Sequence, residues 1–168
     1  VSAPDLFIPA AEASGKIREL GDFMLNEVCS FMASEEFKKL GLSFIEVNLS
    51  VVECMNETLG KHISNIIKKY DIAPKFINFE ITETAIATSF DSFKDNILEI
   101  VNLGSGISLD DFGTGYSSIQ RLTELPLQLV KIDRSLVHST TPKTASVVDK
   151  FVKLFLETGF KVVVEGVE

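Results

Sequence analysis

The sequence predicts an α/β fold in which short parallel strands alternate with helices, as a portion of an eight-unit (β/α)8 barrel of the TIM type. Short apolar runs alternate along the chain with stretches in which apolar residues recur every three or four positions, which gives about five strand-helix units. Each predicted strand ends in a polar or charged residue. A barrel gathers such residues at the carboxyl ends of several strands, whereas an open sheet concentrates them near one switch point. Their spread over all the strands therefore favours the barrel.

The individual elements follow from local periodicity and from the residues that break it. Apolar residues at helical spacing begin at Ile17 and predict a helix that ends near Gly41. Short apolar and β-branched runs predict strands at residues 44–49, 76–81, 107–110, 127–132 and 160–164. Helical spacing predicts the connecting helices at residues 59–70, from about 91 to 104, at 118–125, and through 147–155 up to Gly159. Pro74 and Pro126 mark breaks between units.

Composition indicates one globular domain over residues 1–168. The 168-residue chain is 45% hydrophobic, enough for a buried core. It carries 24 acidic and 16 basic residues, a net charge of -8, and non-specific binding to nucleic acid depends on lysine and arginine. DNA is therefore not an expected partner. A phosphate-bearing ligand could still bind if divalent cations lay between it and a cluster of carboxylates.

The remaining composition excludes several kinds of site. Cys29 and Cys54 lie in helical patterns without a CxxC partner, which predicts buried, reduced thiols. His62 and His138 lack the spacing of zinc ligands. Because no apolar run approaches the roughly 18 residues of a membrane span, we expect no span in this segment and a cytoplasmic location.

The strand-end residues are Asn48, Glu80, Asp110, Lys131 and Glu165. Taken singly, each has an ordinary explanation, because Asp or Asn often caps the next helix and Glu is often simply solvated. Together at one barrel mouth, the carboxylates would repel one another unless cations or protons neutralised them. Oxygen ligands of this kind suit Mg²⁺ or Mn²⁺.

The adjacent pair Asp110 and Asp111 is the sharpest local feature. Neighbouring carboxylates at a strand end can point to either side and each hold a metal ion, although a helix cap beside a solvated acid is the ordinary alternative. Asp111, Phe112 and Gly113 also resemble the magnesium-binding tripeptide of protein kinases. No GxGxxG loop or HRD sequence accompanies them, so a kinase is rejected. Gly113 and Gly115 permit a tight loop after the pair.

Lys131 admits three interpretations. Among acids at an interior barrel position it would stay charged and could orient a water, whereas at a strand edge it would be an ordinary surface lysine. A barrel lyase that forms a Schiff base through Lys131 is the rival enzyme class. Schiff-base chemistry needs a lowered lysine pKa, and neighbouring carboxylates raise it, so the acidic surroundings favour an electrostatic role.

Six segments in this order carry a family resemblance: FIPAAE (residues 7–12), VNLS (47–50), EITET (80–84), DDFGTGYSS (110–118), KIDRSLV (131–137) and EGVE (165–168). Together they resemble the EAL-domain cyclic dimeric GMP phosphodiesterases over nearly the whole chain. DDFGTGYSS is highly specific, and the order and spacing of the other segments reinforce it.

The resemblance implies roles for individual residues. It implies that four residues hold divalent metals: Asn48, Glu80, Asp110 and Asp111. Lys131 and Glu165 would position the hydrolytic water, and Glu83 would hold the DDFGTGYSS loop. The implied reaction opens cyclic dimeric GMP to linear pGpG with Mg²⁺ or Mn²⁺ as cofactor. A domain that binds the nucleotide without cleaving it is the alternative.

The chain also departs from the family pattern. The Glu-Ala-Leu tripeptide would supply a further metal ligand from a strand before Val1, and a glutamine-bearing segment usually follows EGVE. Glu46 stands where the family often has a small residue; by strand parity it lies one layer below Asn48, and Lys131 is the partner expected for it.

Five strands of an expected eight leave unpaired edges and exposed apolar faces, so we expect a piece of a longer domain or a chain completed by a partner. The resemblance further implies a homodimer and cyclase or regulatory domains in the parent chain.

Overall fold

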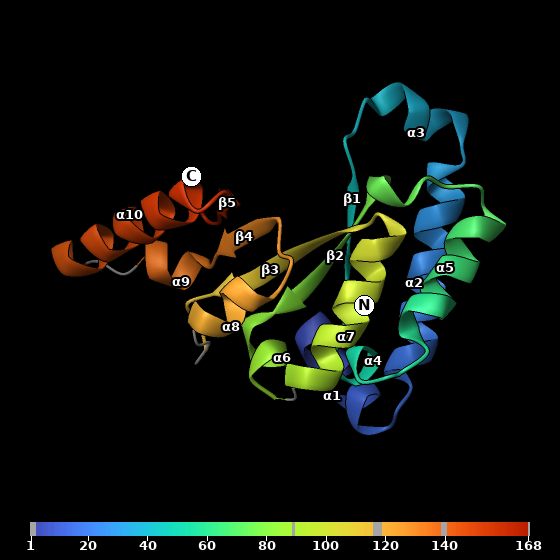
Figure 1. The fold of residues 1–168 in the computed structure, drawn as a ribbon, viewed down its shortest axis with the longest axis horizontal. Coiled ribbons are helices and arrows are strands. Elements are labelled where there is room, and N and C mark those ends of the chain that lie inside the picture. Colours follow the sequence, from blue (N-terminus) through green and yellow to red (C-terminus); the bar gives the residue numbers. More distant parts are fainter. Residues whose placement is uncertain (1–2, 89, 116–118, 139–140, 168) are drawn as a thin grey trace.

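A five-stranded parallel sheet, with the strand order β1-β2-β3-β4-β5, forms the centre of the molecule (Figure 1). The computed structural model describes residues 3–88, 90–115, 119–138 and 141–167. The strands are β1 (Ile45–Asn48), β2 (Ile77–Thr82), β3 (Gly106–Phe112), β4 (Leu129–Ile132) and β5 (Lys161–Val164). Because each strand pairs in parallel with the next one along the chain, the predicted α/β class and the barrel-type succession of strands are confirmed.

Helices connect every pair of successive strands. The longer helices are α1 (Pro4–Ala13), α2 (Ile17–Met32), α5 (Leu59–Lys69), α7 (Phe90–Leu103) and α10 (Pro142–Glu157). The shorter ones are α3 (Glu35–Leu40), α4 (Val51–Cys54), α6 (Glu83–Thr88), α8 (Ile119–Glu124), α9 (Arg134–Val137) and the 3-10 turn η1 (Pro74–Phe76). The helices α5, α7, α8 and α10 occupy the connections in which the sequence predicts them.

Strand parity divides the sheet into an apolar face and a polar face. On β2, Ile77, Phe79 and Ile81 are fully buried and belong to an apolar cluster that includes residues of α5 and α7. Burying a side chain of this size stabilises the fold by about 1.5–3 kcal/mol. The intervening residues Asn78 and Glu80 have the opposite parity and project to the other face. On β2 the core therefore lies on one side and polar side chains lie on the other, whereas β4 and β5 also place Leu129 and Val163 on this second face.

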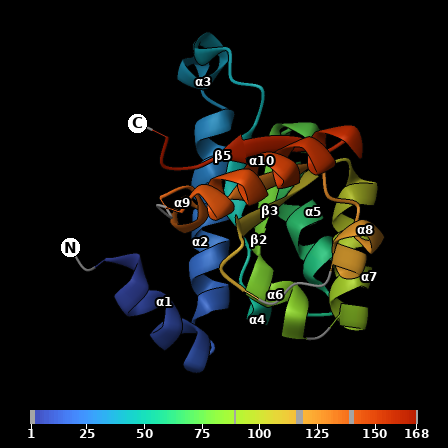
Figure 2. The same ribbon diagram turned by 90° about the vertical axis from the view of Figure 1, so that its left-hand side faces the viewer.

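Helix α2 runs past the β1 side of the sheet, with α1 and α3 at its two ends (Figure 2). The sequence predicts one helix from Ile17 to Gly41, and this prediction is wrong at residues 33–34. Ser34 has an extended backbone, and its side chain accepts a hydrogen bond from the Phe37 N–H at 3.2 Å, which starts α3 as a separate helix. Gly41 ends α3 with a φ of 64°, a conformation that glycine adopts without steric cost.

Glu53 is a buried acid on α4. Its carboxylate accepts a hydrogen bond from the Ser50 N–H at 3.0 Å while the Ser50 hydroxyl accepts one from the Glu53 N–H, a reciprocal capping box. A Cβ on Gly21 of α2 would overlap the Glu53 carboxylate, so glycine allows the two helices to approach. Burial, and then the charges of Asp22 and Glu12, raise the pKa of Glu53 against the opposing hydrogen bonds from Ser50.

The predictions for the cysteines are confirmed. Cys29 and Cys54 are both free and fully buried. Burial raises the pKa of Cys29 to about 11 and that of Cys54 to about 12, which keeps both as unreactive thiols at neutral pH. Among the described residues, no helix has the length and apolarity needed to cross a membrane.

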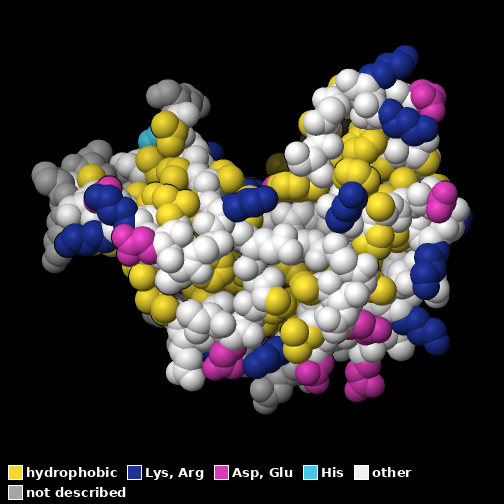
Figure 3. Space-filling view, turned by 45° about the horizontal axis from the view of Figure 1, so that its top comes forward, with side chains coloured by type: hydrophobic (Ala, Val, Ile, Leu, Met, Phe, Trp, Pro, Cys, Tyr) yellow, Lys and Arg dark blue, Asp and Glu magenta, His cyan; other side chains and the backbone are white. Residues whose placement is uncertain are grey.

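The surface is hollowed at the amino ends of the strands (Figure 3). A cavity of about 380 Å³ there is lined by the first residues of several strands and by loop residues, including Lys75, Asn78, Gly106, Gln128 and Lys161. This cavity lies at the end of the sheet opposite to the predicted site residues, which follow the strands at their carboxyl ends.

Candidate active site at the carboxyl ends of the strands

Lys131 lies at the centre of a cluster of strand-end carboxylates. Its Nζ is 2.7 Å from Glu80 Oε1, 3.0 Å from Glu165 Oε1 and 3.3 Å from Asp110 Oδ1. The Lys131 side chain is 16% exposed and that of Glu80 is 7% exposed, so their ion pair is largely removed from water. The fold thus brings together four predicted site residues from β2, β3, β4 and the segment after β5.

Parallel register explains why these side chains meet. Asn48 at the end of β1 is paired with Glu80 on β2, and Thr82 of β2 is paired with Asp110 on β3. Residues of equal parity in adjacent parallel strands project to the same face, so the strand ends present their side chains to one region. Asn48 is exposed, and its pairing with Glu80 places it at the edge of the cluster.

The cluster has one cation for three carboxylates. Burial tends to lower the pKa of Lys131, but the hydrogen bonds to Glu80 and Glu165 and the charges of Glu80 and Asp110 outweigh it, so that the pKa of Lys131 is raised. Burial, together with the charges of Glu46 and Asp110, raises the pKa of Glu80 to about 7 against the opposing effect of Lys131. Lys131 is therefore held protonated, and the carboxylates retain an excess of negative charge.

A protonated Lys131 bears on the rival interpretations made from the sequence. A Schiff-base nucleophile must lose its proton, which the raised pKa of Lys131 opposes. The ion pair with Glu80 is also buried, so Lys131 is not an ordinary surface lysine. The geometry favours an electrostatic or positioning role.

Asp110 and Asp111 lie at an irregularity in strand pairing. The β3–β4 register shifts between Leu109 and Phe112, so the two aspartates occupy a bulge within a strand that extends beyond its predicted end at Asp110. Asp111 has a φ of 57°, in the left-handed region that is costly for a residue other than glycine. Its N–H donates a hydrogen bond to Asp110 Oδ1 at 3.0 Å. Burial, and then the charges of Asp110, Asp133 and Glu165, raise the pKa of Asp111.

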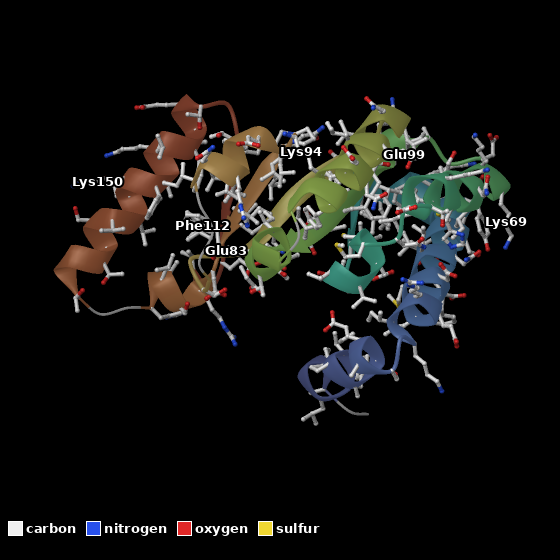
Figure 4. All side chains as sticks on the ribbon, turned by 60° about the horizontal axis from the view of Figure 1, so that its bottom comes forward. Lys69, Glu83, Lys94, Glu99, Phe112 and Lys150 are labelled. Carbon is white, nitrogen blue, oxygen red and sulfur yellow. The ribbon has the colours of Figure 1, made fainter. Side chains whose placement is uncertain are left out.

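Glu83 contacts the loop that follows this pair. It is the first residue of α6, it is only 3% exposed, and its Oε2 accepts hydrogen bonds from the Gly113 and Gly115 N–H groups, both at 2.9 Å. Figure 4 shows the labelled side chains of Glu83 and Phe112 near each other at this end of the sheet. Gly113 has a φ of 104°, which a residue with a Cβ rarely adopts, and a Cβ there would also overlap the Leu136 side chain, so the loop favours glycine. Residues 116–118 of DDFGTGYSS lie outside the described residues.

The expected pairing of Glu46 with Lys131 is wrong. Glu46 Oε1 instead accepts hydrogen bonds from Asn78 Nδ2 at 3.1 Å and from Ser108 Oγ at 3.0 Å. Lys131 lies one layer nearer the strand ends and is occupied by the three carboxylates there. Asn78 and Ser108 were not selected from the sequence, although their spacing of two residues before Glu80 and Asp110 places them on the same face.

The histidines take no part in this cluster. His62 is exposed on α5 and pairs with Asp22 of α2 across 2.5 Å, and His138 is exposed after α9.

The donor chemistry of the site fits a hard divalent cation. The side chains of Asn48, Glu80, Asp110 and Asp111 offer oxygen atoms, and the negative charge near Lys131 exceeds the positive charge. In the part of the chain that the structure describes, no three His, Cys, Asp or Glu side chains are close enough to form a ready metal-binding group. The fit therefore rests on the type and charge of the donors, with Asn48 as the uncharged member.

Comparison with known proteins gives a consistent result. The family model for the EAL domain matches residues 1–168. Cyclic di-GMP phosphodiesterase RocR of Pseudomonas aeruginosa is 36% identical over 67% of this chain and 29% of its own length. The bifunctional diguanylate cyclase/cyclic di-GMP phosphodiesterase MucR of the same organism is 32% identical over 98% of this chain and 24% of its own length.

The structural comparison covers nearly the whole chain. A solved structure of PaMucR phosphodiesterase in complex with c-di-GMP matches with a TM-score of 0.89 and 32% identity, over 99% of this chain and 68% of that one. The present chain spans only 20% to 29% of the length of the curated relatives it matches. Because the family model matches residues 1–168, the chain belongs to the EAL domain family.

Proposed function

We propose that this domain hydrolyses cyclic dimeric GMP to linear pGpG in a metal-dependent reaction. The observation that carries the proposal is the cluster in which Lys131 contacts Glu80, Asp110 and Glu165 at the carboxyl ends of the strands. Catalytic residues of barrel enzymes come from this end. The relatives RocR and MucR are named as cyclic di-GMP phosphodiesterases, and the solved PaMucR structure contains c-di-GMP.

The metal-binding role falls to Asn48, Glu80, Asp110 and Asp111. A bound Mg²⁺ or Mn²⁺ supplies the Lewis acidity that polarises a phosphoryl oxygen and lowers the pKa of water. The excess of carboxylates over lysine around Lys131 supports this assignment, because a further cation relieves their repulsion.

Lys131 and Glu165 would position the water that attacks phosphorus. Lys131 Nζ has three N–H donors and contacts three carboxylates, so it would donate to the water by turning one N–H away from a carboxylate. Glu165 is 33% exposed and can accept a proton from that water. In the overall reaction one ring P–O bond breaks, a hydroxyl from water joins the phosphorus, and the second water proton reaches the leaving oxygen. The product is the linear dinucleotide.

Glu83 would hold the loop that follows β3 in place. Its two hydrogen bonds to Gly113 and Gly115 fix the backbone directly after Asp110 and Asp111. A fixed loop holds the two aspartates in one geometry before a ligand arrives, which supports metal binding and catalysis.

The proposal also covers the parent chain that contains this domain. MucR is named as both a cyclase and a phosphodiesterase, which supports a parent chain that carries cyclase or regulatory domains. We place the domain in the cytoplasm, where such a second messenger acts, and assign it a homodimeric assembly as in the family resemblance.

The test is turnover of cyclic dimeric GMP by the full-length protein, with Mg²⁺ or Mn²⁺ and with a chelator. Release of pGpG with either ion, its loss in chelator, and its loss in Asp110→Ala support the proposal. Asp149→Ala is the control, because Asp149 is an exposed residue of α10 away from the cluster. Binding of the nucleotide by calorimetry without turnover would favour the non-hydrolysing sensor, and full activity of Asp110→Ala would contradict the metal assignment.

A further inference from the structure

A second polar layer lies beneath the strand-end residues. Glu46, Asn78 and Ser108 each stand two residues before a proposed metal ligand on β1, β2 and β3, namely Asn48, Glu80 and Asp110. A separation of two residues in a strand places both side chains on one face at successive heights. The lower layer thus repeats the order of the upper one.

Hydrogen bonds join the lower layer across three strands. Glu46 Oε1 accepts from Asn78 Nδ2 at 3.1 Å and from Ser108 Oγ at 3.0 Å, and Asn78 Nδ2 also contacts Ser108 Oγ. Asn78 is 6% exposed and Ser108 is fully buried. Backbone ladders join only adjacent strands, whereas the contact from Glu46 to Ser108 spans from β1 to β3.

The Asn78 amide is oriented by its hydrogen bond to Glu46. The amide directs its nitrogen toward the Glu46 carboxylate, which leaves Asn78 Oδ1 buried without a hydrogen-bond partner among the described residues. A Cβ on Gly106 would overlap this oxygen, so glycine makes room for the amide in this orientation. An unpaired buried acceptor such as Asn78 Oδ1 is unfavourable. The opposite orientation of the amide would leave the Glu46 carboxylate without this donor, which is more unfavourable because the carboxylate is charged.

Glu46 has no ion-pair partner among the described residues, and its charge is met by the two neutral donors. The carboxylate therefore acts through hydrogen bonds that connect strands. Glu46 lies one layer below Asn48, Glu80 and Asp110, so these hydrogen bonds affect how far each of the three side chains extends along the sheet.

We propose that Glu46 is a positioning residue for the metal site: through Asn78 and Ser108 it fixes β1, β2 and β3 relative to one another, and so presents Asn48, Glu80 and Asp110 together to the cation. The inference rests on the proposed function, because it concerns the same metal. It adds a residue that does not touch metal or substrate and a layer that the family resemblance does not assign.

The test is Mn²⁺ binding to the full-length protein by calorimetry, without substrate. Glu46→Ala should weaken Mn²⁺ binding about tenfold, at the low end of the effect of outer-shell partners, because it leaves Asn78 and Ser108 without their acceptor. Glu46→Gln keeps an acceptor oxygen at the same place and should restore most of the affinity. A purely structural role would lower thermal stability in Glu46→Ala without changing the affinity of the folded protein.

A matched pair of serines controls for stability. Ser108→Ala removes a hydroxyl that contacts Glu46, and Ser105→Ala removes an equally buried hydroxyl that donates to the Pro74 carbonyl at 3.1 Å. We expect weaker Mn²⁺ binding in Ser108→Ala and unchanged binding in Ser105→Ala. These milder variants also decide the question if Glu46→Ala does not fold.

Equal Mn²⁺ affinity in wild type, Glu46→Ala and Ser108→Ala overturns the inference and leaves the proposed function standing. Equal weakening in Ser105→Ala and Ser108→Ala overturns it as well, because the effect is then one of general stability. A wild-type protein that binds no Mn²⁺ defeats the proposed metal site, and this inference with it.

Discussion

Lys131 Nζ lies 2.7 Å from Glu80 Oε1 although the two residues belong to β4 and β2, which are not adjacent in the sheet. The contact passes over β3, whose Asp110 also contacts Lys131. A long, flexible lysine can span this distance, and the low exposure of the pair strengthens its electrostatic attraction. Lys131 therefore holds together carboxylates that would otherwise repel one another.

Replacing Lys131 with Met should destabilise the fold. The change leaves Glu80 buried without its counter-charge, and we expect the free energy of unfolding at pH 8 to fall by about 3 kcal/mol. Urea denaturation in chelator measures it. Lys153→Met is the matched control, because Lys153 also lies 2.7 Å from a carboxylate, that of Asp149, but on an exposed surface. A similar loss in both variants would show that burial of the Lys131 cluster is unimportant.

Glu53 should make stability depend on pH. Burial raises its pKa in the folded state above the ordinary value of 4.5, so the folded protein binds the proton more tightly than the unfolded chain does. The free energy of unfolding should therefore fall as the pH rises above about 4.5, through the titration range of the buried carboxyl. Glu53→Gln keeps an acceptor for the Ser50 N–H and should remove this fall.

Denaturant titrations of wild type and Glu53→Gln over a pH series that begins below the ordinary pKa of glutamate and ends above neutrality measure the contribution of Glu53 as a difference. Glu57→Gln is the control, since Glu57 is exposed three residues after α4. A wild-type minus Glu53→Gln difference that stays constant with pH would contradict the raised pKa.

Strand positions could be predicted from the sequence because they depend on local composition. The apolar run at residues 76–81 and the observed β2 (Ile77–Thr82) differ by one residue at each end. The polar residue at the end of each apolar run likewise identified Asn48, Glu80 and Lys131 as strand-end side chains. The helices α1, α4, α6 and α9 were not predicted, and three of them have only four or six residues, too short for a periodic pattern.

Contacts between strands could not be predicted in the same way. Parity indicated that Glu46 lies below Asn48, but the choice of Asn78 and Ser108 over Lys131 depends on register between strands far apart in the sequence. The bulge at Asp110 and Asp111 could not be predicted from local sequence either, because a register shift depends on how two strands pair. Ser34 followed by two glutamates was a local signal for a new helix, and continuing apolar periodicity concealed it.

Removing the Glu83 carboxylate should loosen the loop after β3. Glu83→Ala leaves the Gly113 and Gly115 N–H groups without their acceptor, and because both glycines are exposed, these donors become open to water. Hydrogen exchange of these two amides in chelator should become faster while amides in the core of β2 keep their protection. Glu124→Ala, at an exposed residue of α8, is the control. Unchanged exchange at Gly113 and Gly115 would mean that other contacts hold the loop.

Asp111 should show a conflict between stability and metal binding. Its left-handed backbone, with a φ of 57°, costs a residue with a Cβ about 1–2 kcal/mol more than glycine. In chelator, Asp111→Gly should therefore be more stable than Asp111→Ala by about 1 kcal/mol, because both variants lack the carboxylate and only alanine keeps the strain. The difference in free energy of unfolding between the two variants, measured by urea denaturation, gives the cost of the left-handed backbone at residue 111.

Mn²⁺ calorimetry on the same two variants measures how much the Asp111 carboxylate contributes to Mn²⁺ affinity. Both should bind Mn²⁺ more weakly than wild type if the Asp111 carboxylate is a ligand, whatever their stability. Asp71 provides the control, since it is the other described non-glycine residue with positive φ, at 56°, and it lies after α5 at an exposed turn. Asp71→Gly should relieve strain of the same kind and leave Mn²⁺ binding unchanged. If Asp111→Gly binds Mn²⁺ as tightly as wild type does, the strained aspartate is not a metal ligand and its conformation needs another cause.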